Sequence, residues 1–257
     1  MSIKKTALLL CISLGLTISQ AYAAPIKVGI ATEAYPPFSV PNAEGNYTGW
    51  EIDIANAVCD QAALECEIVA TSWDGIIPSL VAEKIDVVAA SLSITEERSK
   101  IIDFSDKYYQ TGASLAVAAG SEIQSTPESL AGHKIGVQSG SIHQSYALKH
   151  FKSASIKEYQ TQDEANQDLF SGRIDATLAD ALVLEDFLKS SEGTLCCSSA
   201  GLVAHDEALL GKGIGFGLRK GNDDLKASLN AAIEAIRKNG IYDSITQKYF
   251  EFNIYGE

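Results

Sequence analysis

The chain has 257 residues and carries 33 acidic against 20 basic side chains, a net charge of −13 at neutral pH. Such an acidic chain repels phosphate backbones and anionic membrane surfaces, which argues against nucleic acids and membrane surfaces as partners. The charge does not identify a ligand, because many proteins are acidic for solubility alone.

The first 23 residues have the pattern of a cleavable export signal. Lys4 and Lys5 form a positive start, a short apolar run follows, and Ala21-Tyr22-Ala23 gives the small-x-small pattern that signal peptidase recognises. We therefore predict that residues 1–23 are a signal peptide removed before Ala24. The remaining 234 residues carry a net charge of −15, and they suffice for about two domains.

Strand and helix patterns alternate along the rest of the chain. In the first part, β-branched runs predict strands at 26–32, 66–71 and 86–91, and apolar residues at helical spacing predict helices at 49–64 and 74–83. A second set follows, with strands at 134–138, 156–160, 174–178 and 213–219 and helices at 142–151, 164–170 and 182–189. A long helical region is expected from 223 to about 250. Such alternation is typical of mostly parallel sheets flanked by helices.

Two such α/β units, joined by extended segments at 107–117 and 204–217, predict two interwoven lobes with a cleft between them. We expect the first lobe to comprise residues 24–110 plus 213–257, and the second lobe residues 111–212. Ligands of open α/β sheets bind at the carboxyl ends of strands. The first lobe offers Ser91-Leu92-Ser93 at such an end, and the second offers Ser139-Gly140-Ser141.

A carboxylate site is one interpretation of the segment that follows Ser91 and Ser93. Thr95 is a plausible N-cap for a short helix, and Arg98 lies in the first turn. Free backbone N–H groups, the helix dipole and a bidentate guanidinium together suit a carboxylate. The alternative is a capped helix with a surface arginine.

Aromatic and acidic residues also stand at strand ends. Tyr35 and Trp73 can stack on a flat cation or serve as ordinary packing. Glu33 is either a solvated loop acid or the partner of a distal positive charge on a ligand. Asp180 can hold an ammonium group or cap the helix that starts at Ala181.

Signals for enzymes and metals are weak. The glycines at 211, 213, 215 and 217 lack the lysine–hydroxyl pair of a nucleotide loop, and their spacing of two better fits a close-packed hinge strand. Ser139 lacks the frame of a hydrolase nucleophile, and the four histidines show no metal spacing. We assign His143, the histidine nearest the proposed site, to the helix surface. We expect no cofactor, no metal and no catalytic residue.

Four cysteines follow the signal in an oxidising compartment. Cys59 and Cys66 stand where a helical pattern ends and a strand begins, and a disulfide there would close an eight-residue loop. The alternative is a pair of half-buried thiols. The adjacent Cys196 and Cys197 would form a strained disulfide, and the sequence leaves their redox state open.

From Ala24 to Glu257 the chain resembles the polar amino-acid-binding proteins of bacterial ABC importers (solute-binding protein family 3), particularly the lysine/arginine/ornithine-, histidine- and arginine-binding group. The segments that carry the resemblance are Tyr35–Phe38 (YPPF), Gly49–Asp53 (GWEID), Trp73–Ser79 (WDGIIPS), Ser91–Arg98 (SLSITEER), Ser171–Asp175 (SGRID) and Lys248–Phe250 (KYF). The cysteine pair 59/66 is similar to the single disulfide of that group. The resemblance implies a type II periplasmic binding protein fold with a two-segment hinge.

The resemblance also implies roles for individual residues. Arg98 would hold the ligand α-carboxylate with help from Ser93 and from the backbone at 141–143, which includes Ser141 and Ile142. Asp180 and Ser91 would take the α-ammonium. Tyr35 and Trp73 would enclose the side chain, and Glu33 would meet its distal charge. Ala90 and Ile142 depart from a serine and a threonine common in relatives, which bears on the side chain that is bound.

These observations predict a monomeric periplasmic protein that captures a basic L-amino acid by hinge closure and delivers it to an ABC transporter permease. Arginine is favoured over lysine and ornithine, because two aromatic faces and an acid suit a flat, delocalised cation. Two alternatives stay open. One is a periplasmic cyclohexadienyl (prephenate/arogenate) dehydratase on the same fold, with Glu33 as its acid. The other is a ligand-sensing protein without transport.

Overall fold

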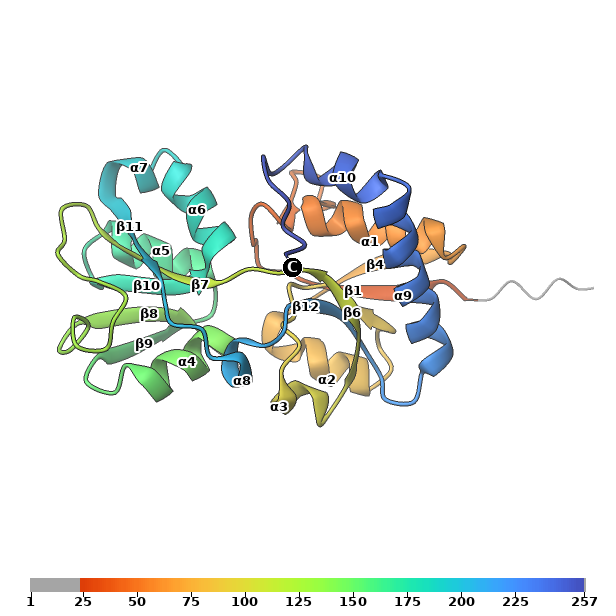
Figure 1. The fold of residues 1–257 in the computed structure, drawn as a ribbon, viewed down its shortest axis with the longest axis horizontal. Helices are drawn as coiled ribbons and strands as arrows, with labels where there is room; N and C mark the ends of the chain where they lie inside the picture. The colour runs from red at the N-terminus through yellow and green to blue at the C-terminus, as the bar shows by residue number, and fades with distance from the viewer. Residues whose placement is uncertain (1–23, 257) are drawn as a thin grey trace, which may run out of the picture.

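The computed structural model describes residues 24–256, so the predicted signal peptide lies outside the described residues. Two five-stranded sheets form two lobes that lie side by side (Figure 1). The sheet of lobe 1 has the order β4-β1-β5-β12-β6 and that of lobe 2 the order β11-β7-β10-β8-β9. A separate hairpin pairs β2 (Val40–Pro41) with β3 (Tyr47–Thr48). The predicted two-lobed α/β fold is confirmed.

Lobe 1 contains the strands β1 (Ile26–Ala31), β4 (Cys66–Thr71), β5 (Val87–Val88), β6 (Asp103–Tyr109) and β12 (Ile214–Leu218). Its helices are α1 (Trp50–Gln61), the 3₁₀ turn η1 (Trp73–Gly75), α2 (Ile76–Val81), α3 (Glu96–Ser99), α9 (Asp223–Lys238) and α10 (Ile241–Thr246). Helices α1 and α9 pack together over a core that includes Ile54, Val58, Leu229 and Ile233.

Lobe 2 contains the strands β7 (Ala113–Ala118), β8 (Lys134–Gln138), β9 (Ser155–Tyr159), β10 (Ala176–Asp180) and β11 (Cys197–Leu202). Its helices are α4 (Ile142–His150), α5 (Gln162–Phe170), α6 (Ala181–Lys189), α7 (Gly193–Cys196) and α8 (Glu207–Leu210). Among residues 24–256, no helix is long and apolar enough to cross a membrane.

Both sheets are mixed, which differs from the mostly parallel sheets that the sequence predicts. In lobe 1, β1 is parallel to β4 and β5, whereas β12 is antiparallel to β5 and β6. In lobe 2, β8 is parallel to β9 and β10, whereas β7 is antiparallel to β10 and β11. The antiparallel strands are the ones that carry the chain between the lobes, β6 into β7 and β11 toward β12. The predicted residue limits of the lobes stay a prediction.

Two glycines explain local features of lobe 1. Gly240 has φ +83°, a conformation that side chains disfavour, and it divides the predicted long C-terminal helix into α9 and α10. Gly215, in β12, lies against Ile94 and Ser105, where a Cβ atom would approach within 2.9 Å of the isoleucine side chain. This close packing fits a strand inside the sheet of lobe 1 and not a nucleotide loop.

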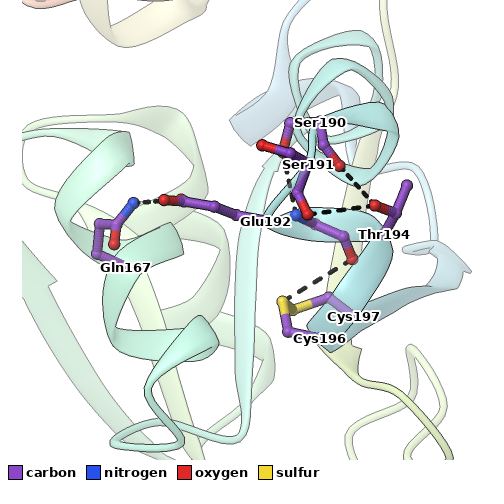
Figure 2. The surroundings of a disulfide bond; sticks show 8 residues. Gln167, Ser190, Ser191, Glu192, Thr194, Cys196 and Cys197 are labelled. Carbon is purple, nitrogen blue, oxygen red and sulfur yellow. Dashed lines mark hydrogen bonds between the residues drawn. A yellow bond between two sulfur atoms is a disulfide. The ribbon is translucent and has the colours of Figure 1, made fainter.

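Both cysteine pairs form disulfides. Cys59, near the end of α1, is bonded to Cys66, the first residue of β4, as predicted. Cys196 and Cys197 are bonded to each other where α7 meets β11, which answers the redox question that the sequence left open. Figure 2 shows this second disulfide beside the turn at Ser190–Thr194, with Glu192 hydrogen-bonded to Gln167 of α5.

Candidate ligand-binding site

A cavity lies between the two lobes and is lined by residues of both. All nine residues predicted to contact a ligand line it, namely Glu33, Tyr35, Trp73, Ser91, Ser93, Arg98, Ser141, Ile142 and Asp180. The first six come from lobe 1 and the last three from lobe 2. Because the carboxyl ends of β1, β5, β8 and β10 face this space, residues that follow those strands converge there.

Arg98 lies on the cavity wall and not on an outer surface, so the alternative of a capped helix with a surface arginine is wrong. Thr95 caps α3, its hydroxyl accepting a hydrogen bond from the backbone N–H of Arg98 at 3.2 Å. The guanidinium donates to the carbonyl of Ser93 at 3.2 Å and lies 5.5 Å from the ring centre of Trp73. Burial lowers the pKa of Arg98 to about 10, with Asp180 opposing that shift, and at this pKa the group stays cationic at neutral pH.

Asp180 ends β10, and its side chain belongs to the cavity and not to the helix that follows. The carboxylate is buried and makes no capping hydrogen bond to α6. Its Oδ2 accepts a hydrogen bond of 2.6 Å from the hydroxyl of Tyr35, and its Oδ1 lies 3.4 Å from Nε2 of His143. A buried carboxylate at the edge of a cavity is suited to an ammonium group, which would compensate its charge.

The two aromatic residues form walls of the cavity and join the lobes across it. Tyr35 donates to Asp180 of lobe 2, and burial next to that carboxylate raises the pKa of the tyrosine well above its usual value. The indole Nε1 of Trp73 donates to the carbonyl of Ser139, also in lobe 2, at 3.1 Å. The lobes are therefore in contact through residues of the cavity itself.

Glu33 is held in place by neighbouring groups and is not a freely solvated loop acid. Its carboxylate accepts the backbone N–H of Trp73 at 3.0 Å and the hydroxyl of Thr32 at 3.1 Å. The first contact satisfies a free N–H at the start of η1, where Ser72 makes no side-chain capping bond. Glu33 thus fixes the position of the Trp73 backbone while it also lines the cavity.

The N-terminus of α4 contributes residues of lobe 2 to the cavity wall. Ser141 caps the helix by accepting the N–H of Gln144 at 3.1 Å, and it donates to the carbonyl of Gln138 at 2.6 Å. Ile142 and His143, in the first turn, line the cavity. Our assignment of His143 to the helix surface is wrong, since its side chain is buried and faces Asp180.

Sequence reasoning also missed Glu51 in the first turn of α1. This side chain is only 1% exposed, borders the cavity and lies directly behind Ser91. A signal was present, because Glu51 lies on the same helical stripe as the buried residues Ala55 and Val58. A single acid on an apolar stripe indicates a buried carboxylate with specific partners.

The arrangement can bind a small zwitterion. One cavity lining contains the guanidinium of Arg98, the carboxylate of Asp180, serine hydroxyl groups and two aromatic side chains. Among residues 24–256 no group of three or more histidine, cysteine, aspartate or glutamate side chains is placed to hold a metal ion.

Comparison with known proteins agrees with this geometry. Residues 26–252 match the model of bacterial extracellular solute-binding proteins, family 3. The chain is 40% identical to the L-arginine-binding protein of Pseudomonas aeruginosa, over 98% of this chain and 99% of that protein. It is 41% identical to the lysine/arginine/ornithine-binding periplasmic protein of Escherichia coli, over 99% and 100% of the two chains.

A solved structure is similar over nearly the whole described chain. An ancestral arginine-binding protein bound to glutamine superposes with a TM-score of 0.80 at 34% sequence identity, covering 90% of this chain and 100% of that one. All three relatives are named as binding proteins for amino acids.

Proposed function

The chain belongs to the bacterial extracellular solute-binding proteins, family 3, and from this membership and its cavity we propose that it captures a basic L-amino acid, with arginine preferred. The observation that carries the proposal is the convergence of Arg98, Asp180 and two aromatic walls on one cavity between the lobes. Each group matches one part of such a ligand.

The α-carboxylate would lie against Arg98. A guanidinium forms two parallel hydrogen bonds to a carboxylate, and its burial in the cavity makes that interaction stronger than it is in water. Ser93 and the first turn of α4, which Ser141 caps and where Ile142 borders the cavity, add hydroxyl and backbone N–H groups.

The α-ammonium would lie between Asp180 and Ser91. Asp180 supplies a buried negative charge from lobe 2, and Ser91 supplies a hydroxyl oxygen from lobe 1. An ammonium group shared between the lobes has all its partners only when the lobes are together.

The ligand side chain would run between Tyr35 and Trp73 toward Glu33. Aromatic faces attract a planar cation, and a carboxylate can pair with the guanidinium at its end. This combination favours arginine over lysine and ornithine. It also disfavours a ligand with a neutral side-chain amide, because Glu33 would then have no positive charge to pair with. The arginine-binding relatives support the same preference.

Binding would proceed by hinge closure, since the ligand's partners are divided between the lobes and only the closed form makes every contact. A closed monomer would then deliver the amino acid to the permease of an ABC importer. The signal peptide predicted at 1–23 and the periplasmic location in the name of the Escherichia coli relative support a periplasmic site of action for this chain.

The test begins with the mature protein, unfolded, freed of bound ligand and refolded, in a thermal-shift screen against the twenty amino acids and ornithine. A ligand at one hundred times its Kd adds about 2.7 kcal/mol of stability, which is a shift of several degrees. We expect arginine to give the largest shift and glutamate none. A response confined to neutral or acidic amino acids would contradict the basic-ligand proposal, and turnover of prephenate would favour the dehydratase alternative.

Arg98→Ala is the matched mutational test. Removing one partner of a buried charge pair costs about 2–5 kcal/mol, so we expect the Kd for arginine to rise at least about thirtyfold by calorimetry. Lys100→Ala, which removes an exposed cation at the end of the same helix, is the control and should leave the Kd unchanged. Equal affinities of the wild type and Arg98→Ala would exclude Arg98 as the carboxylate partner.

A further inference from the structure

A buried carboxyl group supports the cavity from behind, and none of the proposed ligand contacts uses it. Glu51 enters from the first turn of α1, is 1% exposed and reaches the lobe 1 side of the cavity. A charge at such a depth is costly unless hydrogen bonds compensate it, so its partners indicate what it does there.

Three donors converge on Glu51. The backbone N–H of Ser91 donates to Oε1 at 2.7 Å, and the hydroxyl of Ser91 is 3.2 Å from Oε2. The hydroxyl of Tyr108, on β6, also donates to Oε1. Two of the three contacts hold Ser91, which has φ +50°, in the left-handed region that residues other than glycine rarely adopt. Glu51 therefore fixes both the backbone and the side chain of Ser91.

The hydroxyl of Ser91 can be oriented in two ways. When Glu51 is ionised, Ser91 donates its proton to Oε2, and the serine lone pairs are free to accept an ammonium group in the cavity. When Glu51 is protonated, its own O–H can donate to the serine oxygen, and the serine proton then points elsewhere. That second orientation makes Ser91 a poorer acceptor for an ammonium group, because one lone pair of its oxygen is taken by Glu51 and its proton is free to point into the cavity.

The groups around Glu51 make its protonation sensitive to charge in the cavity. Burial raises its pKa from 4.5 to about 7, the donors Tyr108 and Ser91 oppose that shift, and Asp180 adds to it. The titratable groups that act on it come from three places in the fold: Tyr108 and Tyr109 on β6, Asp180 on β10, and Tyr35 after β1. Next to Asp180 stands His143 of α4. The groups that act on Glu51 are thus acids and hydroxyl groups, and none of them is a cation. A cation that enters the cavity would therefore stabilise the ionised form of Glu51.

We propose that Glu51 is the positioning residue for Ser91 and that it releases its proton to solvent when a cationic amino acid binds, so that ligand capture is coupled to proton release. This inference rests on the proposed function, since it requires an ammonium group beside Ser91. No bond other than the O–H of Glu51 breaks, and the leaving proton is taken up by water or buffer.

The sign and size of the coupling follow from linkage. A cation favours ionised Glu51 and lowers its pKa, so protons leave on binding wherever the free protein still holds them. At pH 7 about half of the molecules hold the proton, which gives release of about 0.5 proton per ligand. At pH 9 the group is already ionised, and release falls to zero. Below pH 7 the affinity should fall by up to about tenfold per pH unit.

Calorimetry measures this directly. Arginine is titrated into the refolded mature protein at pH 7 and pH 9, in buffers of low and high ionisation enthalpy, and the dependence of the observed heat on the buffer gives the number of protons. We expect about 0.5 proton released at pH 7 by the wild type, none by Glu51→Gln, and about 0.5 still by Lys100→Ala. Lys100→Ala is the matched control because it removes an exposed charge that does not line the cavity.

A second variant covers the case in which Glu51→Gln does not fold. Tyr108→Phe keeps the ring and removes one donor that favours ionised Glu51, so release should become greater than about 0.5 proton at pH 7. Binding of arginine by the wild type without proton release, or release retained in Glu51→Gln, would overturn the inference. A wild type that binds no amino acid would instead refute the proposed function.

Discussion

The buried position of Glu51 has a consequence for stability that can be measured without any ligand. Folding raises the pKa of this carboxyl from 4.5 to about 7, so the folded protein holds the proton more tightly than the unfolded chain. The contribution to stability is fully present below pH 4.5 and is lost as the pH rises through 7. Each pKa unit corresponds to about 1.36 kcal/mol, and the loss between pH 5 and pH 8 is therefore about 2.5 kcal/mol.

Glu51→Gln removes this dependence, because an amide does not titrate. The variant makes its own pH-independent change in stability through altered contacts with Ser91 and Tyr108. We therefore expect the free energy of unfolding of Glu51→Gln, relative to that of the wild type, to rise by about 2.5 kcal/mol from pH 5 to pH 8. When the free energy of unfolding of the wild type is subtracted from that of the variant, the contributions of all titrating groups that the substitution does not affect cancel.

Urea denaturation of the ligand-free proteins is monitored by circular dichroism at pH 5, 6, 7 and 8. At each pH it gives the difference in free energy of unfolding between Glu51→Gln and the wild type. Lys100→Ala, a change at an exposed side chain, serves as the control and should differ from the wild type by a nearly constant amount. A constant difference for Glu51→Gln as well, or one that decreases with pH, would show that Glu51 is ionised at all these pH values. Burial would then not raise the pKa of this carboxyl, and the proton-release coupling would lose its basis.

Two further predictions concern the cavity and the disulfide of lobe 1. Glu33→Gln should weaken arginine far more than glutamine in calorimetry, because it removes the partner of the distal charge; equal losses would mean that Glu33 acts only by holding the Trp73 backbone. Replacing both Cys59 and Cys66 by serine should lower the free energy of unfolding by about 2–3 kcal/mol in urea denaturation, the amount expected for closing an eight-residue loop. No loss would mean that the unfolded chain is already constrained there.

Much of the cavity could be predicted from the sequence because its residues stand at strand ends. Ser91 follows β5 closely and Asp180 is the last residue of β10, so the position of each strand was sufficient to place the side chain. Tyr35 and Trp73 follow β1 and β4 in the same way. In an α/β lobe the local pattern fixes the strand, and the sheet brings the strand ends together.

The features that were missed depend on contacts far apart in sequence. Glu51 is stabilised by Ser91, 40 residues away, and by Tyr108, 57 residues away, and no local pattern encodes that pairing. The strands β6 and β7 were predicted only as an extended joining segment, since strands that cross between lobes are paired antiparallel to neighbours remote in sequence. His143, on α4, likewise lies against Asp180, which is on β10.

The contacts that join the lobes use the groups that a ligand would need. Tyr35 donates a hydrogen bond to Oδ2 of Asp180, and Trp73 donates one to the backbone of Ser139, so two residues of the cavity join the lobes. These two hydrogen bonds contribute only about 0.5–1.5 kcal/mol each, whereas an α-ammonium and an α-carboxylate add charge-assisted bonds to both lobes. In our proposal, a ligand would therefore stabilise closure chiefly through its charged ends, which would pair with Arg98 in one lobe and Asp180 in the other. In our proposal, Glu33, which lines the same cavity, decides which ligand side chain is preferred.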